Sequence, residues 1–94
     1  MLSIIPLEYK HLDQVIKIEN KTFVEPWSKI SFEKEIENIN SYYIVKIIDD
    51  KVVGYAGIWY VFDEGYLMNI AVDKEYRGLG IGKEMVQNLI DKSQ

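Results

Sequence analysis

The sequence predicts an α+β fold with elements in the order strand, helix, helix, three strands, helix. A run rich in β-branched and aromatic residues, 42–62, indicates strands, and apolar residues with helical spacing occur on both sides of it. A further apolar segment, 66–72, leads through a glycine-rich loop into the final helix. Because 94 residues make one domain at most, we expect a single domain over residues 1–94.

The N-terminal part is expected to form a strand followed by a helix. Residues 2–7 hold Ile4 and Ile5 before Pro6, and the residue before a proline favours extended backbone. Residues 10–23 are expected to form an amphipathic helix, because apolar residues recur on one face: Leu12, Val15, Ile16 and Phe23.

A second helix is expected after the sequence Glu25-Pro26-Trp27-Ser28, which ends the first. Ser28 or Ser31 can cap it, since a serine oxygen accepts a free amide of the first turn. We expect this helix to be short and mostly solvated, with apolar positions at Phe32, Ile36 and Ile39.

Three antiparallel strands are expected next. Residues 42–48 and 52–62 are separated by Asp49-Asp50-Lys51, a tight turn, and the glycines of the second strand (Gly54, Gly57) indicate a bulge or a close backbone approach. Asp63-Glu64-Gly65 is the next expected turn. The strand 66–72 is apolar apart from Asn69, which is typical of a strand covered on both faces. In the final helix, 80–92, one apolar line holds Ile81, Met85 and Leu89.

Composition excludes several classes of function. A net charge of −4 has the wrong sign for binding nucleic acid directly, so a cationic partner is more natural. With no cysteine and one histidine, His11, we expect no disulfide, no thiolate nucleophile and no metal. No apolar run approaches the roughly 20 residues of a membrane span, and the start is too short for a signal peptide, so we expect a cytoplasmic protein.

The loop between the last strand and the last helix is suited to an anion. Gly78, Gly80 and Gly82 alternate there, so backbone amides can point into one concavity at the start of a helix. Arg77 and Lys83 flank the loop with positive charge. These features predict a phosphate or pyrophosphate site.

Other glycine-rich motifs match less well. A Walker loop needs a glycine where Arg77 stands and Ser or Thr where Glu84 stands, and the last glycine interval of a dinucleotide fingerprint is also wrong. The remaining alternative is a glycine-rich turn that only tightens the joint between strand and helix.

The pattern R/Q-x-x-G-x-G/A, filled by Arg77, Gly80 and Gly82 after the strand end Ile70-Ala71-Val72-Asp73, resembles the acyl-CoA loop of the GNAT superfamily of N-acetyltransferases. The phrase from Met68 to Lys83, with Ile18-Glu19 and Glu25-Pro26-Trp27-Ser28, is similar to the RimI type, the ribosomal-protein-alanine N-acetyltransferases.

The resemblance implies a GNAT-type mixed sheet and an acetyl-CoA co-substrate. It places the cofactor contacts on the end of the fourth strand and on the loop: Ile70, Ala71, Val72, Arg77, Gly78, Leu79, Gly80, Ile81, Gly82 and Lys83. The pantetheine arm is expected to pair with the strand as an added strand would, and a backbone amide near Ile70 or Ala71 can polarise the thioester carbonyl.

The family places its general base on a fifth strand and its acid beyond it, positions that lie past Gln94. We therefore expect an incomplete domain, truncated after the loop helix, and name no catalytic residue. The implied function is acetylation of a protein N-terminal amine, with a small-subunit ribosomal protein as the implied partner. The alternatives are a CoA-binding half-domain without turnover and an acetyltransferase acting on a small amine.

Two residues are candidates for the acceptor side. Glu19 stands at the edge of the first helix's apolar face, where it can line a cleft for a peptide amino terminus; the alternative is a partly exposed glutamate paired with a lysine. Trp27 is either part of a substrate-side loop or a lid over the core. We expect His11 to be a surface or capping residue and the tyrosines of the strands to pack.

The fourth strand is also expected to leave an unpaired edge. Such an edge is a template for another chain, so a homodimer or larger oligomer through this strand is predicted.

Overall fold

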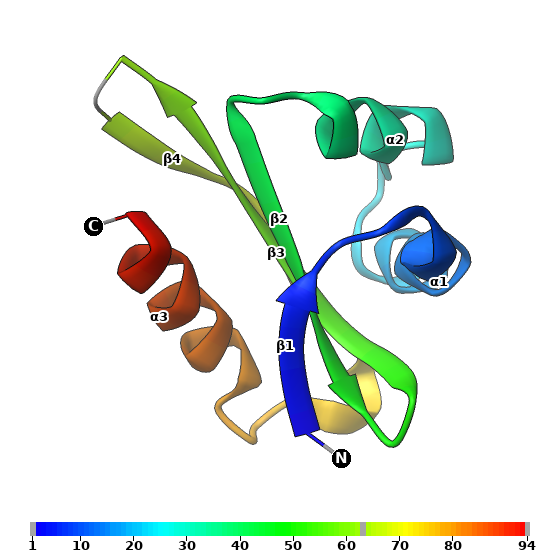
Figure 1. The fold of residues 1–94 in the computed structure, drawn as a ribbon. Helices are drawn as coiled ribbons and strands as arrows, with labels where there is room; N and C mark the ends of the chain where they lie inside the picture. Colours follow the sequence, from blue (N-terminus) through cyan, green and yellow to red (C-terminus); the bar gives the residue numbers. More distant parts are fainter. Residues whose placement is uncertain (1, 63, 94) are drawn as a thin grey trace.

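The computed structural model describes residues 2–62 and 64–93, and it confirms the predicted α+β class and the order of elements (Figure 1). The strands are β1 (Leu2–Pro6), β2 (Ser41–Ile48), β3 (Lys51–Val61) and β4 (Glu64–Val72). The helices are α1 (Leu12–Thr22), α2 (Lys29–Glu37) and α3 (Ile81–Ser93), with two short 3-10 turns, η1 (Tyr9–His11) and η2 (Lys74–Tyr76).

The four strands form one sheet in the order β1-β2-β3-β4, and each strand is antiparallel to its neighbours. The predicted turn between β2 and β3 is confirmed at Asp49 and Asp50, which both adopt positive φ as in a type I′ turn, whereas Lys51, also expected in the turn, begins β3. The glycines of β3 mark the two irregularities of the sheet, as predicted: the register shifts opposite Gly54 and again just after Gly57.

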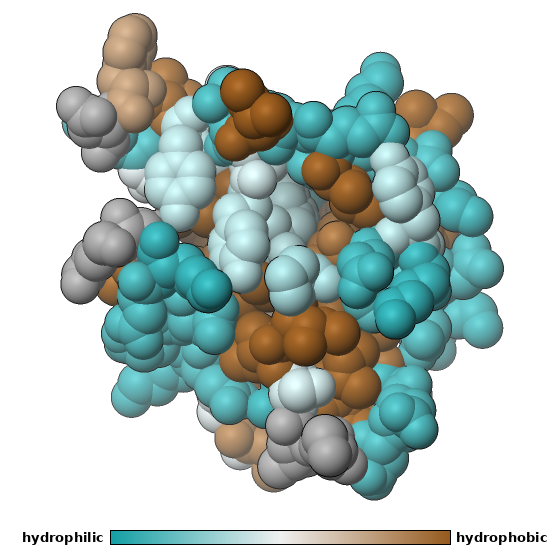
Figure 2. Space-filling view, in the orientation of Figure 1, coloured by the Kyte–Doolittle hydropathy of each residue, from teal (hydrophilic) through white to brown (hydrophobic). Residues whose placement is uncertain are grey.

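Helices cover both faces of the sheet: α1 and α2 lie on one side and α3 on the other (Figure 1). One core cluster joins α1 and α2 to the sheet, and a second joins α3 to the opposite face through the predicted line Ile81, Met85 and Leu89. In the same orientation, hydrophobic residues gather in the middle of the visible face, over β1, with hydrophilic residues on both sides (Figure 2). The start of α3 thereby packs against the end of β4, beside the loop that connects them.

The start of α2 is capped by a serine side chain. Ser28, not Ser31, is the N-cap of α2, because its Oγ accepts the amide of Ser31 at 3.2 Å. The prediction of a short, mostly solvated α2 is confirmed, because Phe32, on its predicted apolar face, is the one buried residue of Lys29–Glu37. Ile39 lies beyond the end of α2 and is almost fully exposed, so it does not belong to the apolar face.

Two predictions about β4 are corrected. Glu64 and Gly65 belong to the strand, whereas Phe62, with φ of 58°, lies in the turn; Asp63 falls outside the described residues. The strand is not covered on both faces, because within β4 only Asn69 and Ala71 are buried. The physical reason is visible in Figure 1, where the β3–β4 hairpin extends beyond the helices.

Candidate functional site

The glycine-rich loop has the backbone that the sequence predicts for an anion cradle. Gly78 and Gly80 have φ of 84° and 80°, a region that side chains with a Cβ disfavour. Gly80 ends the loop, since its carbonyl accepts the amide of Glu84 at 3.0 Å. The first-turn amides of α3 have no carbonyl one turn earlier to bond, so they are free to face a ligand.

The loop also has room for a phosphate. No atom lies within 4 Å of the position that a Cβ would occupy at Gly78 or Gly80. Gly82 is different, because its Cβ would touch the side chains of Ile70 and Val72 at 3.7 and 3.9 Å. The helix start therefore packs against β4 through Gly82 while the preceding loop stays open. Exposed Lys83 and Arg77 supply positive charge.

Arg77 connects the loop to the strand. Its Nε donates a hydrogen bond of 3.0 Å to the carbonyl of Val72 at the end of β4. Together with Lys21 and Thr22 of α1 and residues 70–72, Arg77 lines an open depression of about 400 Å³. This end of β4 therefore combines positive side chains with strand backbone.

The outer edge of β4 is open, since β3 is its one strand neighbour among residues 2–62 and 64–93. Asp73 donates its amide to Val53 of β3 at 2.7 Å. Backbone groups alternate along an antiparallel strand, so Ala71 also faces β3, whereas Ile70 and Val72 face outward. Of the two amides that the sequence offered for polarising a carbonyl, this alternation favours Ile70 over Ala71.

A bulge stands just before this outward-facing pair. In the register with β3, Asn69 opposes Gly57 and Leu67 opposes Ile58, so Met68 is the extra residue of β4. A bulge of this kind bends the strand and redirects its side chains. Beyond the bulge, the strand borders a second pocket.

This second pocket, which we call the acidic pocket, has a volume of about 330 Å³ and shares Ile70 with the depression beside Arg77. Its walls come from α1, the α1–α2 connection and β4: Glu19, Phe23, Glu25, Trp27, Met68, Asn69 and Ile70. These residues include two acidic side chains and no basic one. The two ends of the groove along β4 therefore carry opposite charge.

Glu19 is buried, with 2% of its surface exposed. One carboxylate oxygen accepts the backbone N–H of Trp27 at 2.8 Å, and the other accepts the hydroxyl of Tyr55. The alternative of a partly exposed glutamate paired with a lysine is thus wrong. Burial, followed by the hydrogen bond to Glu19, raises the pKa of Tyr55 well above its usual value.

Trp27 packs over the core, which fits the lid alternative, and it also lines the acidic pocket. Its ring packs at 5.3 Å from Phe32 and 6.5 Å from Tyr43, measured between ring centroids. The hydroxyl of Tyr43 in turn donates to Oδ1 of Asn69 at 2.5 Å. The structure thus brings the two sequence-predicted acceptor-side residues, Glu19 and Trp27, together.

Sequence reasoning missed three members of this cluster. The sequence predicts only packing for Tyr43 and Tyr55, and it shows Asn69 as a polar residue without indicating its role. The available signal was the polarity of Asn69 within an otherwise apolar strand, because a buried polar group needs a partner. The partner, Tyr43, is 26 residues away in sequence.

His11 takes the capping role predicted for it, but it is buried and not on the surface. Its Nδ1 accepts the amide of Glu8 at 3.0 Å, and burial lowers its pKa. Within residues 2–62 and 64–93 no group of three metal-ligating side chains occurs, and no helix there is long and apolar enough to cross a membrane.

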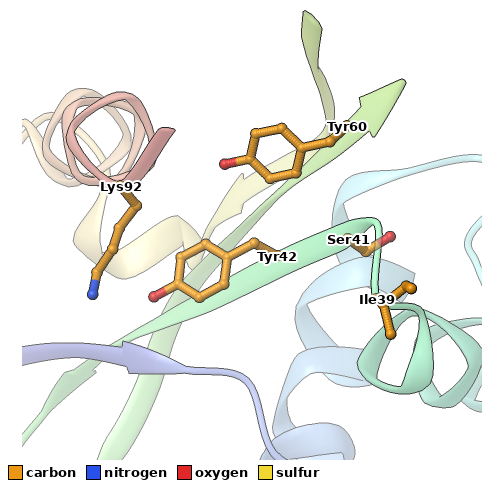
Figure 3. Close-up of a pocket in the computed structure, with 5 residues that line it drawn as sticks. All are labelled: Ile39, Ser41, Tyr42, Tyr60 and Lys92. Carbon is orange, nitrogen blue, oxygen red and sulfur yellow. The ribbon is translucent and has the colours of Figure 1, made fainter. Parts of the chain in front are cut away.

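A further pocket lies between the sheet and the C-terminal end of α3, away from the β4 groove. It has a volume of about 410 Å³ and is lined by Ile39, Ser41, Tyr42, Tyr60 and Lys92 (Figure 3). It shares no lining residue with the two pockets that meet at Ile70.

The chain is similar to known proteins in sequence and in fold. The model of the acetyltransferase (GNAT) family matches residues 12–94. A Bacillus subtilis relative assigned as a ribosomal protein bS18-alanine N-acetyltransferase is 36% identical over 86 residues, which cover 90% of this chain and 57% of the relative. The Escherichia coli enzyme of that name is 31% identical over 93 residues, 98% of this chain and 62% of the relative. The chain thus spans about three fifths of the length of these curated relatives.

Solved structures give the same result for the fold. The crystal structure of the Escherichia coli ribosomal-protein-S18-alanine N-acetyltransferase superposes with a TM-score of 0.88 at 30% identity, over 99% of this chain and 59% of that one. An N-acetyltransferase of Thermoplasma acidophilum, solved with coenzyme A, gives a TM-score of 0.87 at 16% identity, over 99% of this chain and 72% of that one.

Proposed function

The chain belongs to the acetyltransferase (GNAT) family, and from this premise we propose that it transfers acetyl groups from acetyl-CoA to a protein N-terminal amine. The observation that carries the proposal is the groove along β4. Its positive end, at Arg77, and its acidic end, at Glu25, meet at Ile70. An anionic cofactor and a cationic acceptor would thus approach one point from opposite directions.

The loop is the part of this chain that would hold the cofactor. The proposed contacts are those expected from the sequence: residues 70–72 on the strand and 77–83 on the loop and helix start. The backbone amides of the loop and the start of α3 favour a pyrophosphate, with Arg77 and Lys83 beside it. The outward amide and carbonyl of Ile70 and the amide of Val72 suit the amides of a pantetheine arm, whereas the carbonyl of Val72 already accepts a hydrogen bond from Arg77. Bound acetyl-CoA supplies the acetyl thioester.

The acidic pocket is the part that would receive the acceptor. An N-terminal amine is cationic at neutral pH, and the carboxylate of Glu25 favours its approach. We propose Trp27 and Glu19 as acceptor-side residues of this pocket. A small-subunit ribosomal protein is the proposed acceptor, because the Escherichia coli relative is a ribosomal protein bS18-alanine N-acetyltransferase. A ribosomal acceptor implies a cytoplasmic location, which we propose with it.

Calorimetry and mass spectrometry test the proposal. The chain is titrated with CoA and then incubated with acetyl-CoA and a basic peptide that has a free amino terminus. We expect CoA to bind and the peptide to gain one acetyl group at its α-amine. Absence of CoA binding would contradict the assignment of the loop.

A second candidate function is CoA binding without turnover. This candidate is favoured because the glycine-rich loop is suited to CoA, whereas no catalytic acid or base is assigned among the described residues. The same experiment separates the two, since CoA binding with no acetylated peptide supports this candidate.

We also propose that the chain self-associates through β4. The open edge offers unpaired backbone groups, and Tyr66, Leu67 and Met68 beside it are exposed. Light scattering over a concentration series is expected to show a dimer or larger species. A monomer at every concentration would contradict this part of the proposal.

A further inference from the structure

Glu19 is a buried carboxylate whose partners carry no charge. Its side chain bonds the amide of Trp27 and the hydroxyl of Tyr55, and no ion pair between Glu19 and a basic side chain occurs in the described part of the chain. Removing a carboxylate from water without a cation costs several kcal/mol unless hydrogen bonds compensate. Such a group is therefore expected to have a specific task.

The structure indicates the role of Glu19, because this residue accepts a hydrogen bond from each end of the α1–α2 connection. Its backbone carbonyl accepts the amide of Phe23 at 3.0 Å, and its side chain accepts the amide of Trp27 at 2.8 Å. Between these two anchors the chain is irregular, and Val24 is 99% exposed. One residue thus fixes where the connection begins and where it ends.

The position of this connection sets the shape of the acidic pocket. Phe23, Glu25 and Trp27 form one wall, and Met68, Asn69 and Ile70 form the other. The ring of Trp27 also packs against Tyr43, whose hydroxyl bonds Asn69 in the opposite wall. A shift of Trp27 would therefore move one wall and disturb the other.

We propose that Glu19 is a positioning residue, which fixes the 23–27 connection as a wall of the acceptor pocket and acts on the acceptor through Trp27, not by direct contact. Both of its oxygens are engaged, and Tyr55 holds the second one so that the carboxylate cannot turn away. The exposed carboxylate of Glu25 remains to face the acceptor amine. This inference rests on one part of the proposed function, the binding of the acceptor in the acidic pocket. It does not depend on the binding of CoA by the glycine-rich loop.

The test uses Trp27 as its own reporter. All variants carry Trp59→Phe, so that Trp27 is the one tryptophan that remains. Acrylamide quenching of the Trp27 fluorescence is then measured. Glu19→Leu removes the acceptor for the Trp27 amide, so we expect the quenching constant to rise about twofold. Glu19→Gln keeps an acceptor oxygen, so its quenching is expected to stay near the parent value. Glu33→Gln, on α2 outside the pocket, is the matched control.

Binding of an amino-terminal peptide then separates positioning from direct contact. We expect Glu19→Leu to weaken peptide binding about tenfold and Glu19→Gln to preserve it. If Glu19→Gln loses peptide binding while Trp27 stays shielded, the charge of Glu19 contacts the acceptor and the inference is overturned. Unchanged quenching in Glu19→Leu overturns it as well.

Amide exchange in the unsubstituted chain keeps the inference testable if Glu19→Leu fails to fold. We expect the amide of Trp27 to exchange at least about tenfold more slowly than the amide of Val24. Equal exchange rates would overturn the inference. The Trp27 measurements report on the 23–27 connection whether or not acetyl transfer occurs. Failure of the proposed function is recognised separately, because the unsubstituted chain would then not bind CoA.

Discussion

The ring of Tyr43 lies directly against the backbone of Gly57, its partner on the neighbouring strand. A Cβ built on Gly57 would overlap three atoms of the ring. Glycine at this position therefore lets the hydroxyl of Tyr43 reach Asn69, and it links the sheet to the wall of the acidic pocket.

Gly57→Ala tests this relationship. The added methyl group must displace the Tyr43 ring, so we expect a loss of about 2 kcal/mol in the free energy of unfolding and loss of the bond to Asn69. Urea denaturation measures the first effect, and the NMR shifts of the Asn69 side-chain amide report the second. Gly82→Ala is the control, because its methyl group would make only ordinary contacts. Equal stability of the two variants would contradict the argument.

Gly80→Val is expected to weaken CoA binding at least about tenfold. Valine disfavours the φ of 80° that Gly80 adopts, and its side chain would enter the open space where the phosphates are proposed to lie. Calorimetry with CoA measures the effect. Ile39→Val, at an exposed position outside the groove, is the control, with little change expected. An unaltered affinity in Gly80→Val would remove the basis for placing the cofactor here.

Glu25→Lys is expected to weaken binding of a peptide with a free amino terminus about fivefold or more at low salt, since it reverses an exposed charge in the acidic pocket. The difference from the parent should shrink as salt rises, because exposed charges are screened. Fluorescence anisotropy of a labelled peptide follows both effects. Glu33→Lys makes the same change in charge on α2 and should bind normally. An equal loss of peptide affinity in both variants would show that the net charge of the protein, and not the position of Glu25, causes the effect.

Glu84→Gln is expected to destabilise the fold by about 2 kcal/mol. The ammonium of Lys46 is 2.9 Å from Glu84, and the Lys46 side chain is only 7% exposed, so it would lose its carboxylate in a poorly solvated place. Lys46→Met should cost less, because it removes the buried charge. Glu75→Gln, which breaks the exposed pair with Lys51, should change stability by less than about 0.5 kcal/mol. Urea denaturation compares the three, and a harmless Glu84→Gln would contradict the role of the pair.

Stability is expected to fall above about pH 10. Burial raises the pKa of Tyr43 and of Tyr55 above the ordinary value of 10.0, so the folded chain retains phenolic protons that the unfolded chain releases. The contribution is fully present below pH 10 and is lost as the pH rises, by at most about 1.4 kcal/mol per pH unit for each group. Unfolding in urea from pH 8 to 11 measures it. Tyr55→Phe should flatten the decline, whereas Tyr42→Phe, on the partly exposed part of β2, serves as the control.

Most of the fold could be predicted because its signals are local. The β-branched and aromatic runs and the helical spacing of apolar residues predict the four strands and the three α-helices, and the glycines of β3 mark the irregularities of the sheet. The predictions were wrong where the outcome depends on tertiary contacts between elements. Ile39 has the right spacing for the face of α2, but the helix ends before it, and β4 is apolar although half of it projects beyond the helices.

The acceptor side was less predictable for the same reason. Glu19 and Trp27 could be selected as candidates, but the burial of Glu19 depends on Tyr55, which is 36 residues away. Periodicity cannot reveal that a phenol and a carboxylate meet across two elements. The polar Asn69 was visible in the sequence, yet its bond to Tyr43 requires the sheet register, which local patterns do not fix.

The extra residue at Met68 separates two parts of β4 that would otherwise share one regular ladder. Changes in the length or twist of the exposed hairpin tip can be absorbed at this irregularity before they reach Ile70 and Val72. A tag or a fluorophore inserted at the tip is therefore expected to leave the geometry of Ile70 and Val72 unchanged.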